Sequence, residues 1–107
     1  MTITAIVIIR MATFPVDTYI AQTLLRDLVN HDRQPSAFLL YFFLWWRTLG
    51  QKKTEIAISL QDLAIETGLA KRTIQDARRL LVRRKLLAVT RPAKTAAPRY
   101  RVLRPWA

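Results

Sequence analysis

The stretch LQDLAIETGLAKRTIQDARR, residues 60–79, contains the clearest structural signal in the sequence. Ser59 precedes it and can accept a hydrogen bond from the amide of Asp62, an arrangement that starts a helix. Gly68 is expected to end that helix, because glycine readily adopts the left-handed conformation found at helix C-termini. A second helix then opens at Lys71. The stretch therefore predicts two helices joined by a tight turn.

Apolar residues within the two helices recur at helical spacing, which predicts the sides that face a core. The second helix is expected to continue to Lys85. Ala64 is small at the point where the two helices cross, so they can approach closely. The expected inner residues are Leu60, Leu63, Ala64, Ile74, Ala77 and Leu81.

Two short strands are predicted after the second helix. Residues 86–90 and 100–103 read as strands, and the second of them alternates. Residues 91–98 lie between them and are bounded by Pro92 and Pro98, which is typical of a turn segment. The sequence therefore predicts a β-hairpin directly after the second helix.

The first half of the chain predicts three further elements and an N-terminal extension. Residues 16–31 form an amphipathic helix through Val16, Tyr19, Ile20, Leu24 and Leu28. Residues 36–49 form an apolar helix that starts behind Gln34 or Ser36, with Pro35 in its first turn, and stops at a left-handed Gly50. Residues 55–59 form a short strand with Ile56 and Ile58 on one side. Residues 1–10 are either an added strand or an unstructured extension.

The spacing of Ala64, Gly68 and Ile74 closely resembles the helix-turn-helix consensus. The following LLVRRKLLAVT…YRVLRP resembles the winged-helix family of bacterial regulators. The resemblance covers residues 36–105, with residues 36–49 as the first helix of the family. It implies a mainly α fold with a small β-hairpin wing, that is, a winged helix-turn-helix with an extra N-terminal helix. We therefore expect a DNA-binding domain over residues 36–107, preceded by an extension over residues 1–35 that can serve in dimerisation.

Such families place the start of the second helix against base edges and the wing against phosphates or the minor groove. Arginine can read guanine and glutamine can read adenine, whereas basic wing residues contact phosphates. The resemblance implies that the recognition helix binds DNA through Lys71, Arg72, Thr73, Gln75, Asp76, Arg78 and Arg79. It implies that the wing contributes Arg91, Lys94, Thr95 and Arg99.

Three positions depart from the pattern of the family. Ala70 stands where a serine usually caps the recognition helix, so Thr73 or water must satisfy the first amides. Arg78 stands where an apolar inward residue is common, so its stem is expected to pack while its head reaches a phosphate. Lys85 replaces the usual glycine, so the helix either runs further or ends in a strained residue.

The charge distribution agrees with nucleic-acid binding. The chain has a net charge of +11 and a pI near 11.3, which predicts attraction to polyanions. Residues 71–107 contain twelve Lys or Arg and one acid, whereas residues 1–70 contain six of each sign. The surplus therefore lies with the second helix and the hairpin. Arg83, Arg84 and Lys85 are interpreted as a solvated face at the end of the helix.

Other kinds of chemistry find little support in the sequence. There is no cysteine, a single histidine (His31), no acid–base pair of carboxylates and no glycine-rich phosphate loop. We therefore expect no enzyme, no cofactor and no metal. The apolar run over residues 37–46 is too short to span a bilayer, which takes about twenty residues. The expected location is the cytoplasm, in association with the nucleoid.

The apolar helix over residues 36–49 raises the question of oligomeric state. Phe38, Tyr41, Phe42 and Trp45 are expected on one face, and Leu39, Phe43 and Trp46 on the other. A single small core would cover one face. The helix over residues 16–31 can cover the second, or a second copy of the chain can do so, and we favour a homodimer suited to a palindromic site. A ligand pocket lined by these rings is a further alternative.

The leading hypothesis is a sequence-specific binder of double-stranded DNA that regulates transcription. A second hypothesis is the DNA-binding module of a plasmid or phage replication initiator. A third hypothesis is a module that uses the fold for protein contacts and the charge for RNA.

Overall fold

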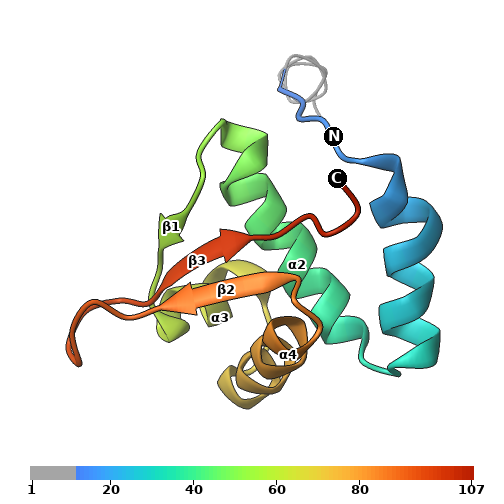
Figure 1. Ribbon diagram of the computed structural model, residues 1–107. Coiled ribbons are helices and arrows are strands. Elements are labelled where there is room, and N and C mark those ends of the chain that lie inside the picture. The colour runs from blue at the N-terminus through green and yellow to red at the C-terminus, as the bar shows by residue number, and fades with distance from the viewer. Residues whose placement is uncertain (1–11) are drawn as a thin grey trace, which may run out of the picture.

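Helix α2 (Pro35–Arg47) runs through the middle of the protein, whose computed structural model describes residues 12–107 (Figure 1). The N-terminal helical segment, helix α4 and strand β3 all pack against α2. Its buried residues follow one another at spacings of three and one, so they form one stripe along the helix. They are Ala37, Leu40, Tyr41, Leu44 and Trp45.

The rest of the chain adds two helices and a three-stranded antiparallel sheet. Helix α3 spans Leu60–Thr67 and helix α4 spans Lys71–Arg83. The strands are β1 (Ile56–Ala57), β2 (Leu87–Thr90) and β3 (Arg99–Val102), in the order β1-β3-β2. The predicted hairpin is confirmed, with Val89 opposite Tyr100, and β1 pairs with the other edge of β3.

The turn between α3 and α4 forms as its residues predict. The Asp62 amide donates to the Ser59 hydroxyl at 3.0 Å, which caps the start of α3. Gly68 ends α3 with φ of 78°. A Cβ at this position would meet no atom within 4 Å, so backbone conformation and not crowding accounts for the glycine.

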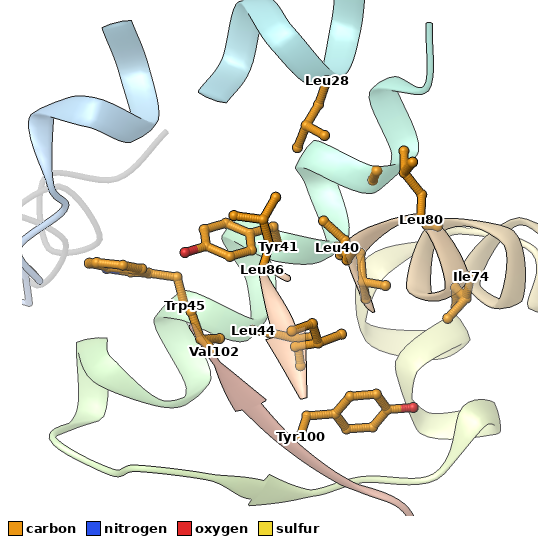
Figure 2. Close-up of a cluster of buried hydrophobic side chains, with 14 of the residues drawn as sticks. Leu28, Leu40, Tyr41, Leu44, Trp45, Ile74, Leu80, Leu86, Tyr100 and Val102 are labelled. Carbon is orange, nitrogen blue, oxygen red and sulfur yellow. The ribbon is translucent and has the colours of Figure 1, made fainter. Parts of the chain in front are cut away.

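The core lies where α2, α4 and the sheet meet (Figure 2). Ile74, Ala77 and Leu81 of α4 are buried as predicted, and Leu80 joins them. On α3 only Leu63 is fully buried, whereas Leu60 and Ala64 are half-buried.

The N-terminal segment is helical, but its hydrogen bonding differs from the expected α-helix. It contains two π-helical turns, η1 (Ile20–Leu24) and η2 (Asp27–His31). Bonds from residue i to i+5 widen a turn, so apolar residues spaced by four stay aligned toward α2. The buried residues are therefore Ile20, Leu24 and Leu28, whereas Val16 and Tyr19, expected on the same face, are partly exposed. The expectation for residues 1–10 lies outside the described residues.

The expected division of α2 into two aromatic faces is only partly correct. Phe42 was expected to share a face with Tyr41 and Trp45, but it is 38% exposed. The buried stripe passes through Tyr41 and Leu44, and Phe42 lies to one side of it, where its ring contacts Phe14 with the centroids 5.9 Å apart. Leu39 and Trp46, expected on the other face, are 52% and 39% exposed.

The predicted left-handed end at Gly50 is wrong. Helix α2 ends at Arg47, a 3₁₀ turn η3 (Leu49–Gln51) follows, and Lys52 adopts the left-handed conformation with φ of 58°. A Cβ on Gly50 would lie 3.1 Å from the ring of Phe14. The glycine therefore permits close packing of Phe14.

Asp17 joins the two ends of the described chain. Its carboxylate accepts hydrogen bonds from Trp106 Nε1 at 3.0 Å and from Arg104 Nε at 2.8 Å. The Trp106 ring stacks on Tyr19 with centroids 4.5 Å apart. The hydrogen bond from Trp106, together with the bond and charge of Arg104, holds the pKa of Asp17 below its ordinary value of 3.8, because these groups favour the ionised form.

The interactions of the Asp17 carboxylate with Arg104 and Trp106 predict a pH-dependent contribution to stability. Because the pKa of Asp17 is lowered by folding, its contribution is present above about pH 4 and is lost as the pH falls through the folded-state pKa. At pH 7 the substitution Asp17→Asn should lower the free energy of unfolding by about 0.5–1 kcal/mol, as expected for a partly exposed pair. Urea unfolding of both proteins at pH 7 and pH 3 checks this. An equal difference at the two pH values would contradict it.

Candidate nucleic-acid interface

All seven residues predicted for the recognition helix lie on α4, outside its buried stripe. Ile74, Ala77 and Leu81 turn inward, so the side chains between them are presented outward. Lys71, Arg72 and Arg79 are exposed. The partly exposed members of the set are Thr73, Gln75, Asp76 and Arg78.

Asp76, the one acid on α4, pairs with two of these arginines. Its Oδ1 lies 3.4 Å from Arg72 Nε and 3.1 Å from Arg79 Nη1. The arginine side chains are 82% and 70% exposed, so water screens both pairs and they add little stability. Both guanidinium groups lie beside the same carboxylate oxygen on the exposed side of the helix.

A groove between α4 and β2 collects the predicted base-reading residues. It has a volume of about 450 Å³, and we call it the α4–β2 groove. Both Arg72 and Gln75 line it, so the structure brings together the two side chains expected to read bases. Its complete lining is Arg72, Gln75, Arg78, Arg79, Val82 and Val89.

Arg78 uses its head group differently from the expectation. Its Nη1 donates a hydrogen bond of 2.7 Å to the hydroxyl of Tyr100, a residue that is fully buried. The bond fixes the guanidinium at the base of the α4–β2 groove and connects α4 to β3. The sequence predicted that the stem of Arg78 packs while its head reaches a phosphate. It did not indicate that a residue 22 positions away supplies an acceptor.

The two ends of α4 show the effects of Ala70 and Lys85, the residues that replace the usual serine and glycine of the family pattern. Ala70 precedes the helix with extended backbone and provides no side-chain cap. The helix ends at Arg83, and Lys85 is left-handed with φ of 59°, so the expectation of a strained residue is confirmed over that of a longer helix. Arg84 is not part of a solvated face, because it is half-buried and pairs with Asp32 and Asp27 of the N-terminal segment.

The hairpin loop, residues 91–98, extends away from the helices (Figure 1). Arg91, Lys94 and Thr95 are all exposed on it. Within the described chain neither Arg91 nor Lys94 forms an ion pair, whereas Arg99 pairs with Glu55 at 3.1 Å. The loop is therefore a cationic projection, and Arg99 shares its charge with an acid.

A second groove lies on the other side of α4 and includes two basic residues, Arg33 and Arg83, that the sequence did not assign to DNA binding. It has a volume of about 430 Å³, and we call it the α2–α4 groove. Arg33 enters it from the turn before α2, and Arg83 from the last turn of α4. The lining comprises Arg33, Gln34, Ser36, Thr73, Asp76, Arg79, Leu80 and Arg83. In the sequence, Arg33 falls between the two helices predicted over residues 16–31 and 36–49.

Residues 12–107 contain no group of three histidines or carboxylates placed to hold a metal ion. None of the helices in this range has the length and apolar character needed to cross a bilayer. Comparison of the chain with protein families, with curated proteins and with solved structures finds no match.

The bond between Arg78 and Tyr100 predicts a measurable coupling. Tyr100→Phe removes the acceptor of a half-buried guanidinium, so it should lower the free energy of unfolding by about 1–2 kcal/mol. Urea unfolding of Tyr100→Phe, Arg78→Ala and the double variant should give effects that are not additive.

Tyr19→Phe is the matched control, because no hydrogen bond of the Tyr19 hydroxyl occurs within the described residues and its loss should change stability little. Additive effects of the Arg78 and Tyr100 substitutions would contradict the coupling.

Proposed function

We propose that this protein is a sequence-specific binder of double-stranded DNA, with a winged helix-turn-helix fold and a role in transcriptional regulation. The observation that carries the proposal is the α4–β2 groove, in which Arg72, Gln75, Arg78 and Arg79 line one side of a helix that follows a tight turn. Guanidinium and amide groups are the side chains best suited to reading base edges.

The dimensions of α4 suit this role. The helix contains 13 residues. At the usual rise per residue its length is about 20 Å, and its diameter with side chains is about 10–12 Å. The major groove of B-form DNA is about 12 Å wide, so it can admit such a helix. In this proposal Arg72 and Gln75 contact bases, and Arg78 supports the groove from its base.

The order of the elements also supports a winged helix-turn-helix. Helices α2, α3 and α4 are followed by the β2–β3 hairpin, and β1 completes a small sheet. The hairpin loop takes the place of the wing, where Arg91 and Lys94 would contact phosphates. Contacts of this kind position a protein on DNA without reading sequence, and they make binding strongly dependent on salt.

This division of roles predicts different outcomes for two pairs of substitutions. Changing Arg72 and Gln75 to Ala should weaken binding to the preferred duplex more than to unrelated duplexes, because base contacts are lost. Changing Arg91 and Lys94 to Gln should weaken binding to all duplexes alike and flatten the dependence of log K on log salt by about two units. Selection of genomic fragments, followed by footprinting and salt titrations, provides the measurement.

The selected sites also distinguish the alternatives. Equal losses on all duplexes for the first pair would contradict base reading by Arg72 and Gln75. Direct repeats near an origin would indicate a replication initiator instead of a regulator. Tighter binding to RNA than to any duplex would overturn the proposal.

We further propose that a second copy of the chain covers the exposed side of α2. Leu39, Phe42 and Trp46 line an apolar groove of about 320 Å³ there, together with Phe14 and Phe43. The N-terminal helical segment packs elsewhere on α2 through its buried residues, so it leaves this side open. A homodimer would match a palindromic site.

The dimer is tested by measuring mass in solution. The chain has a mass of 12.4 kDa, and light scattering of the wild-type protein should give twice that value. Trp46→Glu should be monomeric, because the charge would be buried in the interface. Val29→Glu is a matched control, since Val29 is as exposed as Trp46 but belongs to the N-terminal helical segment and does not line this groove. A monomeric wild type, or a dimeric Trp46→Glu, would contradict the assignment.

A further inference from the structure

The α4–β2 groove and the α2–α4 groove lie on opposite sides of the outermost line of α4. Successive residues of a helix are about 100° apart, so Gln75, Arg78 and Val82 fall on one side of that line, and Thr73, Leu80 and Arg83 on the other. Arg79 lines both grooves, which places it between them. A ligand that holds α4 in a channel would therefore meet both grooves at once.

The α2–α4 groove has the chemistry of an anion site. Three guanidinium groups, from Arg33, Arg79 and Arg83, line it together with the amide of Gln34 and the hydroxyls of Ser36 and Thr73. Its one carboxylate, Asp76, already pairs with Arg72 and Arg79.

The positive charges of two of these arginines, Arg33 and Arg83, are available to bind an anionic ligand. Within the part of the chain that the structure describes, neither Arg33 nor Arg83 forms an ion pair, and both are at least partly exposed. The adjacent Arg84, by contrast, pairs with Asp32 and Asp27. The groove thus keeps two unneutralised guanidinium groups that come from segments far apart in the chain.

We propose that the α2–α4 groove binds the phosphates of the DNA strand that flanks α4 on the side away from the hairpin. This inference rests on the proposed function. A helix with its side chains nearly fills the major groove, so the groups that flank it are the sugar–phosphate backbones of the two strands. The hairpin loop contacts the phosphates of one strand, and Arg33 and Arg83 contact those of the other. Arg33 thereby becomes a DNA contact outside the helix-turn-helix.

The test uses the full chain with Arg33→Asn and Arg83→Gln combined. Arg33 has φ of 53°, and asparagine is chosen because it tolerates this conformation well. The double variant should bind all duplexes more weakly, keep its preference among sequences, and show a salt slope shallower by about 1.8, because two phosphate contacts are lost. Within each half-site, ethylation interference should show that contacts on one strand disappear while those on the other remain.

The matched control removes two positive charges elsewhere, by Arg26→Gln and Lys53→Gln. Arg26 is exposed on the N-terminal segment, and Lys53 is exposed beyond the opposite end of α2. The control should keep the slope of the wild type, and thermal unfolding verifies that both variants are folded.

The outcomes distinguish a failure of the proposed function from a failure of the phosphate site in the α2–α4 groove. A wild-type chain that binds no duplex overturns the proposed function itself. A wild type that binds, with an unchanged slope and unchanged interference pattern in the Arg33 and Arg83 variant, overturns only the assignment of the α2–α4 groove. An equal loss of slope in the control also overturns it, because net charge would then explain the effect.

Discussion

The structure depends on the need to cover helix α2 from several directions. Its apolar and aromatic residues extend around most of its circumference, so no single neighbour can remove them from water. The N-terminal segment, α4 and β3 each cover part of it. This requirement fixes the position of α4, because Ile74 and Leu81 reach the core only when the polar side of α4 faces outward. The candidate interface is thus a consequence of how α2 is buried.

Polar bonds then fix the covering elements in register. The Tyr41 hydroxyl donates to the carbonyl oxygen of Leu103 at 2.8 Å, and the Tyr100 hydroxyl accepts from Arg78. Burial raises the pKa of Tyr41, so its hydroxyl stays protonated and remains a donor. No buried side-chain nitrogen or oxygen lacks a partner in residues 12–107. A core of this kind specifies one arrangement, because an alternative packing would leave these groups unpaired.

Local signals in the sequence predicted the elements well, and features set by distant residues were not predictable. The Ser59 hydroxyl accepts from an amide only three residues away, and Gly68 adopts the left-handed conformation itself, so the ends of α3 follow from local residues. Gly50 was predicted to end a helix in the left-handed conformation. The structural reason for a glycine there is the close packing of Phe14, a residue far earlier in the chain. Likewise, the α4 residues of the α4–β2 groove could be expected from helical spacing. The α2–α4 groove could not, because Arg33 and Arg83 meet only after α4 folds against α2.

The hydrogen bonds that Arg104 and Trp106 donate to Asp17 have a practical consequence. They bring the two ends of the described chain together near one end of α2, while α4 lies toward the other (Figure 1). A fluorescent protein or affinity handle joined after Ala107 would therefore project away from α4 and leave its outer side accessible.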